Sequence, residues 1–193
     1  MKRLRREAMG TPGHLSFEFG GRQSLDFTWT LRYRAVYPTE LLDRPDKLAD
    51  WLRAAGLPTG RVTPSQLVEG RALREALYAA ALDTIDGNPL QPRHLRIINR
   101  CATAEPATVR LRTDGSTALL VRRGRETAAG LAVIARDAID LLAVDGHRIR
   151  RCEGPSCSLL FHDTSRPGTR RWCSAQRCGN KVNTRTYRAR HDP

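Results

Sequence analysis

Four of the five cysteines in this chain form two matched pairs, and this spacing restricts the fold more than any other feature. The pairs are Cys152-x4-Cys157 and Cys173-x4-Cys178, and fifteen residues separate them. Such pairs are typical of a tetrahedral zinc site with four thiolate ligands, in which each pair forms a knuckle and the spacer folds back. Four thiolates close the coordination shell and leave no position for water, so the sequence predicts one structural zinc ion. In so small a unit, metal binding supplies most of the folding free energy.

Other interpretations of these residues remain open. The four thiols could be ordinary buried cysteines, and His162 or His191 could act as a ligand, although neither histidine fits the paired spacing. An odd number of cysteines argues against a disulfide framework. The fifth, Cys101, stands alone in the body of the chain and is interpreted as a small buried side chain.

The first residues do not form a complete export signal. Met1 to Arg6 resembles the basic start of a signal peptide, but no apolar stretch follows it. The longest stretch without Asp, Glu, Lys or Arg runs from Ala8 to Phe17, whereas a membrane span needs about 20 apolar residues. We therefore expect a cytoplasmic, nucleoid-associated protein. The basic residues at 2–6 could add a DNA contact, or Met9 could be the true start.

Charge divides the chain into units with different properties. The formal net charge is +13, from 33 Lys and Arg against 20 Asp and Glu. It is +3 over residues 1–7, +2 over residues 8–146 and +8 over residues 147–193. We therefore predict a flexible basic arm at 1–14, a domain at 15–146 and a small zinc finger at 147–193, whose charge indicates an anionic partner.

The body is predicted to be α+β, with helices mixed with short sheets. Thr63-Pro64-Ser65-Gln66 has the pattern of a capping box with proline at the first helical position. Its helix should bury one stripe, formed by Leu67, Gly70, Leu73, Leu77 and Ala80. Further helices are expected from Asp43 to Gly56, after Pro92 and from Glu126 to Val144. The last of these has a broad apolar stripe of Leu131, Ile134, Ala135, Ala138, Ile139 and Leu142.

Two segments alternate apolar and polar residues, which predicts strands. Leu15 to Phe19 should form a short strand that ends in the turn Gly20-Gly21. Residues 109–121 should form a hairpin around Asp114-Gly115, with Val109, Leu111, Leu119 and Val121 pointing inward.

The tail resembles a known family. Its motifs are Arg151-Cys152-x4-Cys157-x3-Phe161-x-Asp163-x-Ser165-Arg166, Arg170-Arg171-Trp172-Cys173-Ser174 and Cys178-Gly179-Asn180-Lys181. They resemble the CGNR zinc-finger family of bacterial proteins, which implies a treble-clef-like knuckle, hairpin and helix. Lys181 stands where the family has arginine, which keeps the charge but loses the bidentate guanidinium.

The body resembles the ABATE domain that is usually found ahead of that finger, described as a stress-induced transcription regulator. The matching motifs are Leu25-Asp26-Phe27 with Thr30, Leu48-x2-Trp51-Leu52 and Leu73-Arg74-Glu75-Ala76. Trp29 stands where asparagine is usual.

The segment after Cys178 has the pattern of a helix that could bind DNA. Lys181, Arg185 and Arg188 fall at offsets 0, 4 and 7, so a helix would place them on one cationic ridge. We expect this ridge and Asn180 to contact double-stranded DNA, while Arg166, Arg170 and Arg171 grip phosphates from the spacer. Asn180 could instead cap the helix, and the ridge could be a solvated surface. Trp172 is expected to pack over the zinc site.

The body shows no convincing catalytic set, so we expect no enzymatic activity. Asp26, between two large apolar residues at an expected strand edge, is a candidate ligand-pocket residue, with a turn or an ion pair as the simpler alternative. The resemblance implies a DNA-binding transcription regulator whose body senses a small-molecule effector or mediates homodimer formation. An adaptor that binds an acidic protein, a nucleic-acid enzyme and an RNA-binding module are the alternatives.

Overall fold

The computed structural model describes residues 17–180 of the chain. Within this range the helices are α1 (Gln23–Thr28), α2 (Pro45–Ala54), α3 (Pro64–Ile85), α4 (Pro92–Ala102) and α5 (Glu126–Val144), with a 3-10 turn at Gly146–Arg148 and a π-helical turn at Ala175–Gly179. Three antiparallel strand pairs complete the α+β fold: β1 (Leu31–Arg32) with β2 (Thr39–Glu40), β3 (Thr108–Leu111) with β4 (Thr117–Leu120), and β5 (Ile149–Arg151) with β6 (Leu160–His162).

The predicted start of α3 is confirmed by its hydrogen bonds. The backbone N–H of Thr63 donates to Gln66 Oε1 at 2.9 Å, and the N–H of Gln66 donates to Thr63 Oγ1 at 3.3 Å. Pro64 occupies the first helical position, where a backbone donor is not needed. The five residues of the predicted stripe are all buried.

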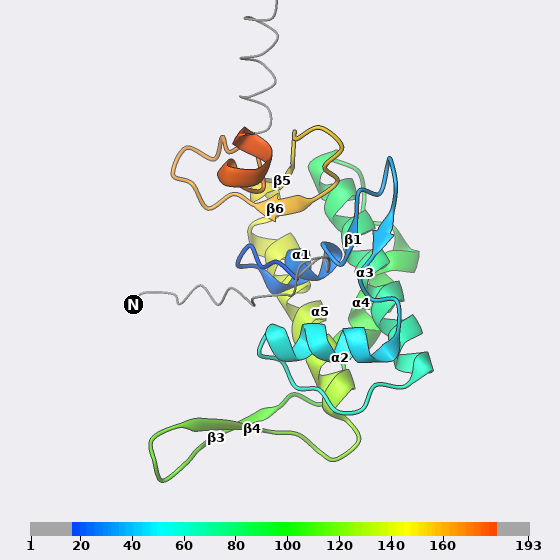
Figure 1. The fold of residues 1–193 in the computed structure, drawn as a ribbon, viewed down its shortest axis with the longest axis vertical. Helices are drawn as coiled ribbons and strands as arrows, with labels where there is room; N and C mark the ends of the chain where they lie inside the picture. The colour runs from blue at the N-terminus through cyan, green and yellow to red at the C-terminus, as the bar shows by residue number, and fades with distance from the viewer. Residues whose placement is uncertain (1–16, 181–193) are drawn as a thin grey trace, which may run out of the picture.

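Helix α5 has the predicted bounds and crosses the core against α3 and α4 (Figure 1). Ile134 is fully buried among Trp51, Leu73 and other apolar side chains. Gly130 lies so close to the backbone oxygen of Pro58 that a Cβ atom would overlap it, so α5 needs glycine there. The prediction for Ile139 is wrong, because 40% of this residue is exposed.

A buried ion pair explains the Leu73-Arg74-Glu75 motif of the body. Arg74 is only 3% exposed and donates to both carboxylate oxygens of Glu40, at 2.6 and 2.7 Å. Its Nε donates to Glu75 Oε1 at 2.7 Å. This pairing attaches β2 to α3. It also satisfies the charge of Arg74, which would otherwise be costly to bury.

The predicted strand over Leu15–Phe19 is wrong for its described part. Residues 17–19 form no strand, and the ring of Phe19 lies 5.6 Å from that of Trp51. The chain turns at Gly21 and enters α1, so Asp26 lies on a short helix and not at a strand edge. Alternation over five residues could not distinguish an extended segment that covers a core from a paired strand.

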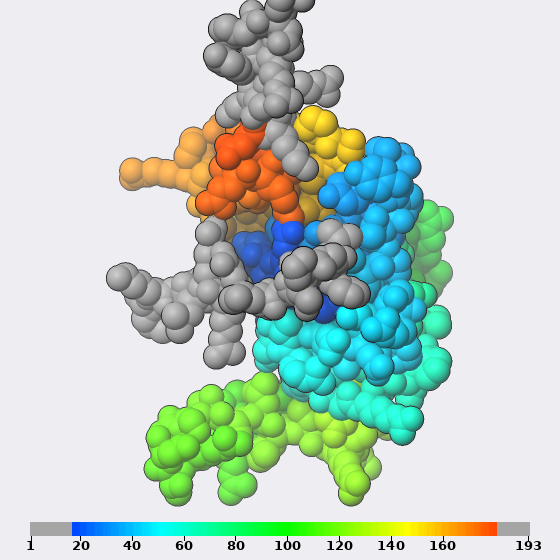
Figure 2. All heavy atoms as spheres, in the orientation of Figure 1, coloured from blue at the N-terminus to red at the C-terminus, as the bar shows by residue number. Residues whose placement is uncertain are grey.

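The predicted hairpin of β3 and β4 is confirmed, but the inward orientation of its apolar side chains is wrong. Val109, Leu111 and Leu119 are all exposed, and only Val121, just after β4, is half-buried. Figures 1 and 2 show the hairpin projecting from the helices at the end of the molecule opposite the C-terminal unit. The alternating pattern correctly identified one apolar face, but no part of the described chain packs over it.

The body and the C-terminal unit share buried side chains. Leu25 of α1 and Leu141 of α5 form a cluster with Ile149 of β5 and Leu160 of β6. None of the described helices is both long and apolar enough to cross a membrane.

Candidate metal centre

The four paired cysteines meet at one point, as the spacing predicts. The sulfur atoms of Cys152, Cys157, Cys173 and Cys178 all lie within 4.8 Å of one another. The Sγ of Cys173 is 3.9 Å from that of Cys157 and 3.8 Å from that of Cys178. Four sulfurs at 2.3 Å from a central zinc ion would lie about 3.8 Å apart, so the arrangement fits a tetrahedral thiolate site.

Each cysteine pair is held by its own local structure. Cys152 directly follows β5 and Cys157 lies in the loop that leads to β6, so the first pair closes this hairpin. Cys173 precedes the π-helical turn and Cys178 lies within it. The side chain of Ser174 caps this turn by accepting from the N–H of Arg177 at 3.3 Å.

Backbone donors surround the sulfur atoms as in a thiolate site. The N–H groups of Gly154 and Cys173 donate to Cys152 Sγ at 3.4 and 3.3 Å. A Cβ atom on Gly154 would lie 2.9 Å from the Cβ and Sγ of Cys178, so only glycine fits this loop. The N–H groups orient and stabilise the ligand, as expected of groups just outside a metal shell.

Four thiols this close do not all ionise readily without a cation. Hydrogen bonds from the thiols of Cys157 and Cys173, and then from the two N–H groups, hold the pKa of Cys152 well below its usual 9.0. Hydrogen bonding to the Cys152 thiolate raises the pKa of Cys157 and Cys173, and burial raises that of Cys178. A divalent cation removes this repulsion and allows all four thiolates to form.

Two side chains outside the shell complete the centre. Trp172 packs against the cysteine cluster, as predicted. The Nη2 of Arg177 lies 3.9 Å from Cys173 Sγ, and its guanidinium forms an ion pair with Glu18. Glu18 in turn lies 3.2 Å from the guanidinium of Arg32. A body carboxylate thus positions a cation beside a thiolate, which compensates part of the negative charge of a four-thiolate zinc site.

The body also provides the surface on which the metal centre rests. Trp29, which follows α1, is buried with Cys152, Cys173 and Phe161 in one apolar cluster. Its indole Nε1 donates to the backbone oxygen of Leu160 at 2.7 Å. Sequence motifs could not predict this contact, because 131 residues separate the two groups.

Comparison with known protein families agrees with this architecture. A family model named ABATE, described as "putative stress-induced transcription regulator", matches residues 21–145. The chain belongs to the ABATE family. The model of the CGNR zinc finger matches residues 148–191, and therefore includes all four cysteines. No curated protein matches the chain.

In this CGNR finger, Cys152, Cys157, Cys173 and Cys178 are the zinc ligands. His162, considered as a competing ligand, does not join them. His162 Nε2 lies 3.5 Å from Asp145 Oδ2. His191 lies outside the described residues.

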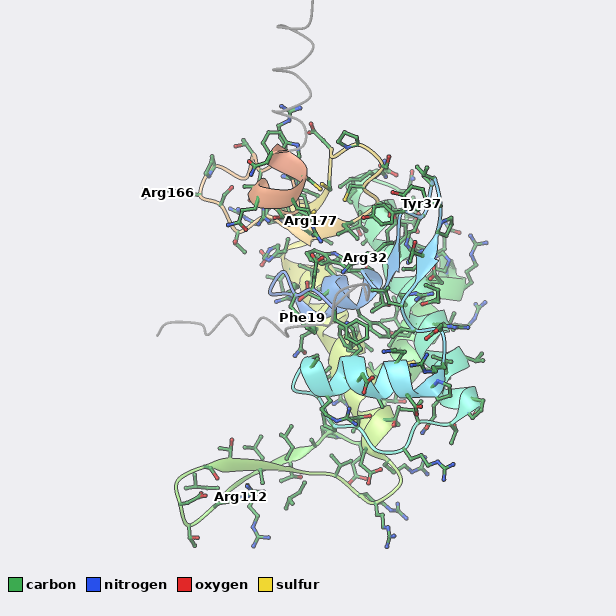
Figure 3. The ribbon with its side chains drawn as sticks, viewed as in Figure 1. Phe19, Arg32, Tyr37, Arg112, Arg166 and Arg177 are labelled. Atoms are coloured by element: carbon green, nitrogen blue, oxygen red, sulfur yellow. The ribbon has the colours of Figure 1, made fainter. Side chains whose placement is uncertain are left out.

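The arginines expected to grip phosphates have different environments. Arg166 is exposed, and Figure 3 shows it on the outer side of the finger. Arg170 donates to the backbone oxygens of Trp172, at 2.7 Å, and Cys173. The guanidinium of Arg171 lies 2.6 Å from the carboxylate of Glu153. Arg170 therefore also holds the second knuckle, and Arg171 is partly neutralised.

Of the residues after Cys178 that were expected to contact DNA, the structure describes only Asn180. Asn180 is exposed and has helical backbone angles, with φ −63° and ψ −37°. Lys181, Arg185 and Arg188 lie outside the described residues, so their contact with DNA stays a prediction.

Two arginines that the motif analysis did not single out support the spacer loop. Arg148 Nη1 donates to the backbone oxygens of Asp163 and Ser165, at 3.2 and 3.0 Å. Arg150 Nη2 donates to Gly168 O at 3.4 Å. These acceptors are uncharged backbone oxygens of the loop that also carries Arg166, and the charge of Arg150 interacts with the Asp163 carboxylate. Asp163 was visible as part of the family motif, and its side chain now has a clear structural role.

That role is to shape the loop. Asp163 is fully buried, and its carboxylate accepts from the N–H groups of Ser165, at 2.9 Å, and Arg170, at 2.8 Å. Burial acts to raise the pKa of Asp163, but these hydrogen bonds outweigh burial and hold the pKa below its usual 3.8.

Asp26 lies at the junction between the ABATE domain and the finger. Its carboxylate accepts from the N–H groups of Gly20, at 2.6 Å, and Gly21, at 3.1 Å, so it holds the turn before α1. Burial raises the pKa of Asp26 to about 7. Asp26 also borders a hollow of about 10 Å³ beside Trp29 and Cys173, which has room for about one water molecule.

Proposed function

We propose that the chain is a bacterial DNA-binding transcription regulator whose CGNR finger contacts double-stranded DNA. The observation that carries this proposal is the cationic loop at residues 163–170. Arg148, Arg150 and Arg170 donate to backbone oxygens and form no ion pair within 4.0 Å among the described residues, although Asp163 compensates part of the charge of Arg150, and exposed Arg166 lies on the same loop. Phosphate groups are the natural ligands of such a surface.

The position of Asn180 also supports this proposal. Cys178 and Gly179 are buried at the zinc site, and the next residue is exposed and helical. The sequence then continues with Lys181, Arg185 and Arg188. A zinc ion would therefore fix the first turn of a basic helix, which could contact a major groove or the phosphate backbone.

We propose that the ABATE domain mediates dimer formation. One finger presents little surface, and specific DNA recognition generally needs a second module. The alternative role, sensing of a small-molecule effector, has less support. The hollow beside Asp26 is far smaller than the roughly 300–1,000 Å³ of ordinary ligand pockets.

The proposed role requires no catalysis. Four thiolates leave zinc without an open coordination position, so the metal would shape the finger and would not activate water. We place the protein on the nucleoid in the cytoplasm as part of the same proposal.

Selection of genomic DNA fragments by the purified, zinc-loaded chain tests this function. We expect enrichment of a limited set of duplex fragments by the wild-type chain, and loss of enrichment for Cys173→Ser. Equal recovery by both proteins would contradict the proposal. Parallel selections with RNA and with acidic protein ligands would then identify the RNA-binding module or the adaptor as the better account.

A further inference from the structure

The hairpin of β3 and β4 has one apolar and uncharged face. Its register pairs Val109 with Leu119 and Leu111 with Thr117, so these four side chains lie on the same side. Val109 is 65% exposed, Leu111 72% and Leu119 49%. The other side carries Arg110, opposite Ala118, and Leu120, opposite Thr108. The two sides therefore differ in charge, and the side that lacks charge is open.

A hairpin of this kind needs a partner. Two strands alone are only marginally stable in water, and a third strand or a packed surface is generally required. Figure 2 shows that the hairpin stands away from the helices, and Figure 3 marks Arg112 near its outer end. Contiguous exposed apolar side chains on a soluble protein generally mark an interaction site.

We propose that a second copy of this chain covers this face, so that two hairpins pack together in a dimer. The inference rests on the dimerisation role proposed above and names its surface. Charge restricts where a second copy can bind. A chain with a formal charge of +13 repels its own copy over most approaches, whereas the uncharged side of the hairpin offers contact without bringing arginines together.

The ends of the hairpin are complementary across a two-fold axis. A symmetric dimer interface is self-complementary, and when its two-fold axis crosses the strands the turn of each hairpin lies over the base of the other. Asp114 is in the turn and exposed, whereas Arg122 and Arg123 directly follow β4 and are also exposed. An antiparallel arrangement therefore places Asp114 of one chain near these two arginines of the other, twice per dimer.

The size of the face predicts a reversible dimer. Only four side chains of each chain contribute, so two such faces would bury less than the roughly 1,200 Å² of a standard interface, in the range of weak, transient contacts. We therefore expect the monomer and dimer to exchange at micromolar concentrations. The finger lies at the opposite end of the molecule, so dimer formation leaves both fingers free (Figure 1).

Sedimentation equilibrium of the zinc-loaded full chain, without DNA, tests the proposal through two neighbouring leucines. Leu119→Thr changes the apolar face, whereas Leu120→Thr makes the same change on the side of Arg110, at a similar exposure of 47%. We expect Leu119→Thr to weaken the dimer about ten- to a hundredfold, because the loss occurs in both chains, and Leu120→Thr to change the dissociation constant less than about threefold. Circular dichroism and zinc content should match the wild type for both variants.

A charge exchange tests the antiparallel arrangement. Asp114→Arg should weaken the dimer, and a mixture of this variant with Arg122→Asp/Arg123→Asp should restore association between unlike chains. A wild-type chain that stays monomeric at about 100 μM would overturn the proposal. Equal effects of the two leucine substitutions on the dissociation constant would also overturn it. Because these experiments contain no DNA, their failure leaves the proposed DNA binding to be judged by its own test.

Discussion

The indole Nε1 of Trp29 donates a hydrogen bond of 2.7 Å to the backbone oxygen of Leu160, and so connects the ABATE domain to a strand of the CGNR finger. Both groups are buried, and Trp29 also packs against zinc ligands. The stability of the body and that of the metal centre should therefore be coupled.

Trp29→Phe tests this coupling, because it removes the N–H donor and retains most of the ring. We expect a loss of about 1–3 kcal/mol in the free energy of unfolding of the zinc-loaded chain, since a buried acceptor is left without its donor. The loss should shrink in a Cys173→Ser background, in which the finger no longer holds Leu160 in place. Urea unfolding of the four proteins in this cycle measures the difference.

Trp51→Phe is the matched control for that cycle. Trp51 is fully buried in the core of the body, and its Nε1 has no hydrogen-bond partner among the described residues. Its substitution should cost the same with or without Cys173. Equal coupling for Trp29 and Trp51 would contradict the connection described here.

Loss of a zinc ligand should destabilise the body as well as the finger. Cys173→Ser should reduce bound zinc well below one equivalent per chain and lower the melting temperature by about 5 °C or more, because Leu25 and Leu141 lose their packing against Ile149 and Leu160. Elemental analysis and calorimetry measure the two effects. Cys101→Ser, which changes the lone thiol at the end of α4, should retain a full equivalent of zinc.

Arg177 should slow the release of zinc. Arg177→Gln removes the cation 3.9 Å from Cys173 Sγ, and we expect zinc transfer to a colorimetric chelator to be about tenfold faster. Glu18→Gln should increase the rate of zinc transfer less than Arg177→Gln does, since Glu18 only positions Arg177. Arg171→Gln is the control, because Arg171 pairs with Glu153 and makes no hydrogen bond to sulfur among the described contacts. Release rates that are the same for all four proteins would exclude this role.

Asp26 should make the protein less stable as the pH rises. Burial raises its pKa from 3.8 to about 7 in the folded chain, so between these values the folded state binds a proton that the unfolded state releases. The contribution of Asp26 to the free energy of unfolding is therefore fully present at low pH and is lost between about pH 4 and pH 7. The total loss should be about 2–4 kcal/mol.

The measurement for Asp26 is a difference between two proteins. Zinc binding itself weakens in acid, so unfolding free energies should be compared at pH 5 and pH 8 for wild type and Asp26→Asn with excess zinc. The wild type should lose more stability than Asp26→Asn over this interval. A parallel dependence in the two proteins would show that Asp26 does not titrate there.

The elements predicted well from the sequence are those whose signals are local. The capping box at Thr63 and Gln66 determines the start of α3 regardless of the rest of the chain, and α5 has a stripe long enough to define its period. The zinc ligands could also be predicted, because the spacing within each pair reflects one short loop around the metal.

The remaining features depend on contacts between distant segments. Nothing near Trp29 indicates that Leu160 accepts its hydrogen bond, and Val109 and Leu111 alternate as in a hairpin with a covered face. Charge counting had a similar limit. It could not show that Arg170 holds backbone oxygens or that Arg171 pairs with Glu153.

The most direct test of the DNA-binding role is the salt dependence of binding to a labelled duplex, measured by fluorescence anisotropy. If 5 or 6 phosphates are neutralised, the logarithm of the binding constant should fall with a slope of about −5 against the logarithm of salt concentration. Arg166→Ala should reduce the slope by about one, whereas Arg96→Ala, an exposed arginine on α4, should leave it unchanged. A flat salt profile, or equal binding by wild type and Cys173→Ser, would contradict the account.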